Sequence, residues 1–156
     1  MASLAGKKAL VLGGSRGIGA AIVERLAAEG AETTFTYAGS KDVSAALAAR
    51  TGTTARQADS ADREAVATLI AEQGAIDILV VNAGVVAAGD PLEIDPADVD
   101  RLIDVNVRGP YHAAVEAARA MPEGGRIIVI GSVNGDRLPF PGFAASRATS
   151  ARAASR

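Results

Sequence analysis

The sequence contains no cysteine, which excludes disulfide bonds, thiolate metal sites and a cysteine nucleophile. It has a single histidine, His112, so the usual ligands of a zinc site are missing and we expect no bound metal. Tryptophan is absent and aromatic residues make up only 3% of the chain, so small aliphatic side chains must fill the core. Such a core suits helices packed closely on a parallel sheet.

A strong charge and long apolar runs are missing as well. The formal net charge of −2 argues against a general nucleic-acid-binding protein. The first ten residues lack the apolar run of a signal peptide, and no stretch reaches the roughly 18 apolar residues that a membrane span needs. We therefore expect a soluble, cytoplasmic protein of 156 residues with neither nucleic acid nor membrane as a partner.

What the sequence does contain is a regular alternation of strand and helix patterns. Strands with their following turns are expected over residues 8–14, 32–40, 53–60, 76–84 and 125–132. Helices are expected over residues 17–30, 41–50, 62–73 and 95–121, the last with Asp95 as N-cap and Pro96 at its first position. Right-handed crossovers between such strands predict an α/β, Rossmann-type doubly wound parallel sheet of about five strands in the order 3-2-1-4-5.

The sharpest motif is the glycine loop LGGSRGIGAAI between the first expected strand and the first helix. Its spacing is Gly13-x-x-x-Gly17-x-Gly19, which differs from the G-x-G-x-x-G pattern of many dinucleotide sites. Gly13 permits the tight turn, Gly17 leaves the backbone open to a pyrophosphate, and Gly19 allows a close approach of helix and strand. An ordinary glycine-rich turn is the alternative.

The choice of dinucleotide follows from charge. An NAD site has an acidic residue at the end of the second strand, where it binds the ribose 2′-hydroxyl. Here Tyr37 holds that place, residues 38–41 carry no carboxylate, and Arg16 lies in the glycine loop. A guanidinium without a competing carboxylate favours a 2′-phosphate, so the sequence predicts NADP(H) rather than NAD(H). Arg16 as a solvated surface charge remains the alternative.

Two further turns fall at strand ends, where doubly wound sheets bind their ligands. Asp59 and Ser60 follow the third strand, and Asp59 can accept from an adenine amino group, act as a helix N-cap, or do both. Asn82, Ala83 and Gly84 follow the fourth strand. The predicted cofactor-binding residues are thus Gly13, Ser15, Arg16, Gly17, Ile18, Gly19, Tyr37, Asp59, Ser60, Asn82, Ala83 and Gly84.

With Asn106 in the long helix and Ser132 after the fifth strand, these motifs resemble the short-chain dehydrogenase/reductase family over residues 7–142. The segments LGGSRGIGAAIV, YAGSKD, DSADR and GSVNGDR are similar to those of the bacterial cyclic-di-GMP-binding biofilm dispersal mediators, a branch close to the 3-oxoacyl-carrier-protein reductases. Two positions depart from the family pattern. Leu12 replaces its Thr and Val81 replaces its first Asn, and both changes remove hydrogen bonds that brace the turns.

The resemblance implies an oxidoreductase that interconverts a carbonyl and an alcohol. In that family a Tyr protonates the carbonyl, a Lys one helical turn later holds the ribose, a Ser binds the carbonyl oxygen and an Asn completes a proton relay. Ser132 and Asn106 match the Ser and the Asn, and are the predicted catalytic residues. Pro110 has no N–H, which leaves the main-chain carbonyl of Asn106 free to hold a water; a kink for packing alone is the alternative.

The Tyr-x-x-x-Lys pair of the family is missing. Tyr37 and Tyr111 are the two tyrosines, and Phe143 and Arg147 stand where the pair is expected. Phe has no hydroxyl to act as an acid, and Arg does not substitute for the ammonium of Lys. We expect residues 1–142 to form an NADP-binding domain lacking the C-terminal part of the family, followed by an aberrant, truncated or frameshifted Ala/Ser/Arg tail over 143–156, and the chain to be inactive.

Three functions therefore remain open. The first is an NADP-dependent oxidoreductase by family, acting on an unidentified small carbonyl substrate. The second is a regulatory protein that binds NADP or cyclic-di-GMP without catalysis, and the third is a non-functional fragment. The resemblance also implies that full-length relatives are homo-oligomers that use the long helix as an interface.

Overall fold

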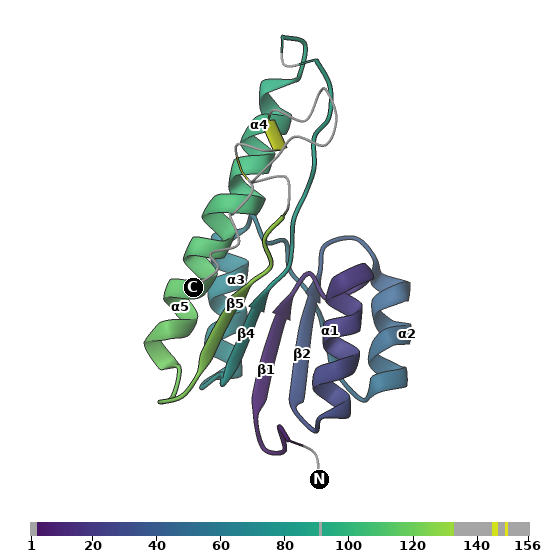
Figure 1. Ribbon diagram of the computed structural model, residues 1–156, viewed down its shortest axis with the longest axis vertical. Helices are drawn as coiled ribbons and strands as arrows, with labels where there is room; N and C mark the ends of the chain where they lie inside the picture. The colour runs from purple at the N-terminus through teal and green to yellow at the C-terminus, as the bar shows by residue number, and fades with distance from the viewer. Residues whose placement is uncertain (1–2, 91, 133–144, 147–148, 150–156) are drawn as a thin grey trace.

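The chain forms a five-stranded parallel sheet in the order β3-β2-β1-β4-β5, seen in the computed structural model of Figure 1. The structure describes residues 3–90, 92–132, 145–146 and 149. The predicted strand order and fold class are confirmed. The strands are β1 (Lys8–Leu12), β2 (Glu32–Tyr37), β3 (Thr54–Gln57), β4 (Ile78–Val81) and β5 (Arg126–Val129).

Helices cover both faces of the sheet (Figure 1). They are α1 (Gly17–Ala28), α2 (Lys41–Thr51), α3 (Arg63–Gln73), α4 (Pro96–Ile103), the π-helical turn η1 (Asp104–Arg108) and α5 (Gly109–Ala120). Because side chains alternate along a strand, β1 contributes to two cores. Val11 packs with Val23 and Leu47 of α1 and α2, whereas Leu10 and Leu12 pack with residues of α3 and α5.

The long helix expected over residues 95–121 has a different internal structure. Asp95 caps it through a bond from Ala97 N–H (2.8 Å) and Pro96 is its first residue, as predicted, but η1 separates α4 from α5. Gly109 N–H bonds to the carbonyl of Asp104, five residues earlier. Pro110 follows directly and has no N–H to continue the α-helical pattern, which accounts for the wider turn at this place.

Asp59 is not the N-cap of the third helix, α3, so this one of its two predicted roles is wrong. The N-cap of α3 is Asp62, whose carboxylate accepts from Ala65 N–H at 3.0 Å. Asp59 lies in the preceding turn and accepts from Ala61 N–H at 3.0 Å. Asp59 is therefore a turn residue at the end of β3, and its side chain faces the edge of the sheet where a ligand would lie.

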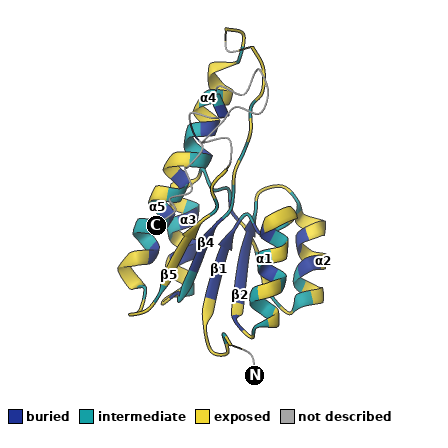
Figure 2. Cartoon of the chain, in the orientation of Figure 1, coloured by how far each residue is buried: buried dark blue, intermediate teal, exposed yellow. Residues whose placement is uncertain are grey.

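Strand β5 lies at the edge of the sheet and is exposed along its length (Figure 2). Ile128 and Val129 are 46% and 47% exposed, so the part of the chain that the structure describes leaves apolar side chains of β5 uncovered. No helix in the described ranges is both long and apolar enough to span a membrane.

Candidate functional site

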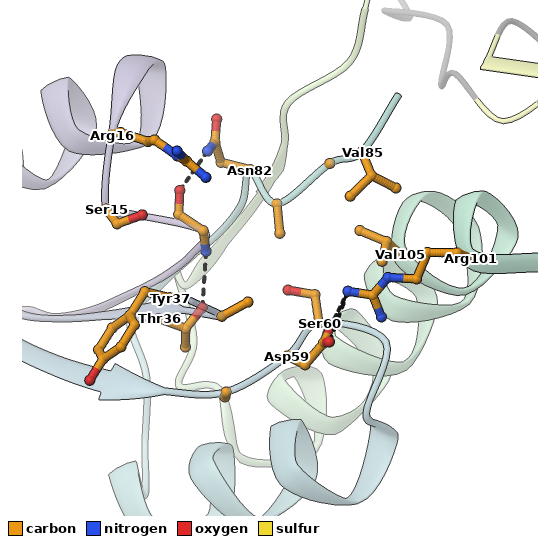
Figure 3. Close-up of a pocket in the computed structure, with 15 residues that line it drawn as sticks. Ser15, Arg16, Thr36, Tyr37, Asp59, Ser60, Asn82, Val85, Arg101 and Val105 are labelled. Carbon is orange, nitrogen blue, oxygen red and sulfur yellow. Dashed lines mark hydrogen bonds and ion pairs between the residues drawn. The ribbon is translucent and has the colours of Figure 1, made fainter. Parts of the chain in front are cut away.

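A cavity of about 310 Å³ opens at the carboxyl ends of β1, β2, β3 and β4 (Figure 3). Nine of the residues predicted to bind a cofactor lie around it: Gly13, Ser15, Arg16, Tyr37, Asp59, Ser60, Asn82, Ala83 and Gly84. Thr36, Ala38, Ala58, Val85, Arg101 and Val105 complete the wall and were not predicted from the sequence. The strand-end turns therefore converge as the sheet topology requires.

A second cavity of about 260 Å³ adjoins the first and shares Asn82, Ala83, Gly84 and Val85 with it. The predicted catalytic residues Asn106 and Ser132 both line this second cavity, together with Ile18 of the glycine loop. The structure thus brings Ile18, Asn106 and Ser132 together beside the first cavity, and Gly17 and Gly19 lie in the first turn of α1. Their roles with ligands stay predictions.

The turn after β1 is held by hydrogen bonds from neighbouring strands. Gly13 has a positive φ of 77°, which favours glycine. Its N–H donates to Thr36 Oγ1 at 2.9 Å, and its carbonyl accepts from Asn82 Nδ2 at 2.8 Å. The Thr36 hydroxyl and the Asn82 amide therefore brace this turn, although Leu12 and Val81 replace the Thr and the first Asn of the family pattern.

The close approach predicted for Gly19 is confirmed. A Cβ added at Gly19 would overlap the carbonyl oxygen of Gly13 and lie 2.6 Å from Asn82 Nδ2. A Cβ on Gly13 would lie 2.7 Å from the Cα of Ala83. The first turn of α1 therefore sits directly against the ends of β1 and β4, and no larger residue fits at either position.

Arg16 immediately precedes α1 and has an extended backbone, with φ of −157°. It lines the first cavity, and among the residues that the structure describes no ion pair includes it. The free amide groups of a helix N-terminus and a neighbouring guanidinium both favour an anion. A cofactor phosphate therefore suits this end of the cavity.

Asp59 and Arg101 form an ion pair across the opposite wall (Figure 3). Arg101 Nη2 donates to both carboxylate oxygens, at 2.9 Å to Oδ1 and 2.8 Å to Oδ2, and the side chains are 43% and 40% exposed. Partial burial raises the pKa of Asp59, but the bond from Ala61 N–H and the guanidinium of Arg101 outweigh it and keep this pKa below its ordinary value. Asp59 is thus a carboxylate at neutral pH.

The side chain of Asn106 clamps the loop that follows β4. Its Oδ1 accepts from Val85 N–H and its Nδ2 donates to the Val85 carbonyl, both at 2.9 Å. Nδ2 also donates to Thr149 Oγ1 at 3.1 Å. Ser146 Oγ similarly donates to the carbonyl of Ala87 at 2.8 Å. Phe143 and Arg147 lie outside the described residues, and the water predicted at the Asn106 carbonyl stays a prediction.

Known proteins resemble the chain over most of its length. A family model described as short chain dehydrogenase matches residues 7–152. The cyclic-di-GMP-binding biofilm dispersal mediator protein of Escherichia coli is 58% identical over 149 residues, which are 96% of this chain and 63% of that protein. Versicolorin reductase 1 of Aspergillus parasiticus is 43% identical, over 83% of this chain and 53% of that protein. The chain thus spans about half to two thirds of these relatives.

Solved structures agree with the sequence comparisons. A crystal structure of BdcA in complex with NADPH has a TM-score of 0.92 and 58% identity, over 94% of this chain and 60% of that chain. A short-chain dehydrogenase/reductase from Serratia marcescens has a TM-score of 0.90 and 48% identity, over 94% of this chain and 64% of that chain.

Gly19→Ala should destabilise the chain by about 1–3 kcal/mol, because the added methyl group overlaps the carbonyl of Gly13. The free energy of unfolding in urea measures the effect. Gly39→Ala is the matched control, since nothing lies within 4 Å of a Cβ at Gly39. Equal loss of stability in the two variants would contradict the proposed close contact at Gly19.

Arg101→Met should lower the free energy of unfolding by about 0.5 kcal/mol at pH 6, the size usual for an exposed ion pair. The pKa of Asp59 in the folded chain lies below its ordinary value of 3.8. The contribution of the pair is therefore complete above that value and is lost as the pH falls through the folded pKa. Urea unfolding between pH 6 and pH 2.5 should show the two chains converging, and a gap that persists in acid would rule out this account.

Proposed function

Because this chain belongs to the short-chain dehydrogenase family, we propose that its strand-end crevice binds NADP(H), with the adenosine part in the first cavity and the nicotinamide in the second. The observation that carries the proposal is the position of Arg16, a cation without an ion-pair partner among the described residues, at the start of α1. A relative's structure that contains NADPH supports the same choice.

The pyrophosphate would lie over the first turn of α1. Gly17 has a positive φ of 56°, and no atom lies within 4 Å of a Cβ built on it, so the backbone there is open on the side where a phosphate would approach. The free amide groups of a helix N-terminus favour an anion, and Ser15 adds a hydroxyl donor at the cavity wall. These groups fit a phosphorylated ligand.

The 2′-phosphate would lie between Arg16 and the end of β2. Tyr37 and Ala38 form the cavity wall where an NAD site typically has a carboxylate. Asp59 is the one acidic residue among those lining this cavity, and Arg101 neutralises it. Arg16 therefore gives the cavity a positive charge that a 2′-phosphate would balance, which favours NADP(H) over NAD(H).

In the second cavity, the nicotinamide supplies or accepts a hydride when bound. Ser132 would hold the oxygen of a small carbonyl compound, and Asn106 fixes the loop at Val85, which also lines this cavity. The proton donor of the family is missing from the sequence, where Phe143 occupies the matching place. We therefore propose that the polypeptide binds the cofactor without reducing carbonyl compounds.

A regulatory role in binding cyclic-di-GMP is the second candidate. Its support is the 58% identity to a protein named for binding this nucleotide. Arg16, at the wall of the first cavity, also provides a cationic group for a second phosphorylated ligand.

Titration with NADPH and NADH tests the cofactor proposal. Arg16→Gln should raise the Kd for NADPH about tenfold and leave the Kd for NADH unchanged, because one charge-assisted contact to the 2′-phosphate is lost. Arg25→Gln is the control, since Arg25 lies on the same helix in an ion pair with Glu29. An equal loss of affinity for both cofactors would contradict the assignment of Arg16 to the 2′-phosphate.

Incubation of the purified chain with NADPH and a panel of carbonyl compounds should leave the nicotinamide absorbance unchanged, because the chain has no Tyr-x-x-x-Lys. Ser132→Ala serves as the control for contaminating reductases. Oxidation of NADPH that scales with the chain and disappears in this variant would show that the polypeptide is catalytically active.

A further inference from the structure

The segment that follows β4 is held at two places by side chains that are distant from it in the sequence. Residues 84–88 belong to no helix or strand, so their backbone N–H and C=O groups need other partners. Asn106 bonds to both the N–H and the carbonyl of Val85, each at 2.9 Å. Ser146 does the same for Ala87: its Oγ accepts from the N–H at 3.1 Å and donates to the carbonyl at 2.8 Å.

A third hydroxyl joins these two side chains. Thr149 Oγ1 accepts from Asn106 Nδ2 at 3.1 Å and donates to the carbonyl of Ser146 at 3.2 Å. Ser146 and Thr149 are only 3% and 8% exposed, so their bonds are shielded from water and are stronger than bonds at the surface. We call Asn106, Ser146 and Thr149 the loop clamp.

The loop clamp borders the second cavity, where the nicotinamide is proposed to lie. Asn106, Ser146 and Thr149 all line that cavity, and none of them lines the first. Val85 and Val86 belong to the wall of the second cavity as well. Val86 follows one clamped residue and precedes the other, so the loop clamp fixes the backbone of this wall on both sides of it.

We propose that Ser146 and Thr149 are positioning residues for the nicotinamide end of the cofactor, because they hold the segment after β4 in the conformation that forms this wall before the ligand binds. The inference rests on the proposed function. A ligand that has to order the wall itself binds more weakly, by the fraction of molecules in which the wall is already formed. Both residues fall within 143–156, where the sequence predicts an aberrant tail, and the inference gives them a role in the site.

A serine hydroxyl suits the place at Ala87, since it donates and accepts at the same time. Ser146→Ala removes both bonds to Ala87. If the hydroxyl only stabilised the fold, its loss would not distinguish between ligands of the folded chain. A positioning role predicts instead that the loss is confined to ligands that enter the second cavity.

NADPH and 2′-phospho-ADP-ribose provide matched probes, because the second compound lacks the nicotinamide ring and keeps the rest of the dinucleotide. The full chain, Ser146→Ala and Thr149→Val are titrated with each by calorimetry. Ser146→Ala should bind NADPH about tenfold more weakly, within the range usual for the loss of hydrogen bonds. Thr149→Val should bind it about threefold more weakly, since Val85 keeps both bonds to Asn106. Binding of 2′-phospho-ADP-ribose should change by less than about twofold, because neither residue lines the first cavity.

Thr33→Val is the matched control. Thr33 is also buried, and its Oγ1 donates to the carbonyl of Ala31 near the start of β2, whereas the cavities lie at the carboxyl ends of the strands. This variant should bind both ligands as the unchanged chain does. Circular dichroism and thermal melting establish that each variant is folded.

Each outcome decides the matter. Equal weakening of the two ligands by Ser146→Ala, or unchanged binding of NADPH, would overturn the positioning role. If Ser146→Ala does not fold, the same comparison is made with Thr149→Val, and unfolding of both variants would show that the hydroxyls maintain the whole fold and have no specific role at the cavity. An unchanged chain that binds neither ligand, or that binds NADPH no more tightly than 2′-phospho-ADP-ribose, would instead overturn the proposed function and this inference with it.

Discussion

Backbone segments meet at the ends of β1 and β4 with no space for a side chain, and the crevice depends on this close approach. A Cβ on Gly13 would lie 2.7 Å from the Cα of Ala83, and one on Gly19 would overlap the carbonyl of Gly13. The contact fixes where α1 begins, so it also fixes the direction of the first amide groups of α1 and the position of Arg16. The position of Arg16 and of the first turn of α1 at the crevice is therefore a consequence of packing.

The parts of the fold that depend on local pattern were predictable from the sequence. Apolar runs ending in glycine or polar turns gave all five strands, and their separation by helices gave the order of the sheet. The N-cap at Asp95 and the positive φ of Gly30 after α1 also follow from residue type alone. Strand-end residues such as Asn82 could be placed at the crevice because parallel strands all end at one edge.

The features that were missed depend on partners far away in the sequence. Thr36 looks like one more β-branched strand residue, and nothing local indicates that its hydroxyl braces Gly13. Arg101 looks like a solvated charge on an amphipathic helix, yet it reaches Asp59, 42 residues earlier. Pro110 indicated a disturbed helix, but not that Gly109 beside the wider η1 turn lies against the carbonyl of Ser60, 49 residues earlier.

Residues of the η1 turn line both cavities. Val105 and Asn106 are consecutive, yet Val105 lines the first cavity and Asn106 lines the second. One turn earlier Arg101 holds Asp59, and one turn later Gly109 lies against the carbonyl of Ser60. A single helical run therefore forms part of the walls of both cavities. A shift of this run would therefore move wall residues of the two cavities together.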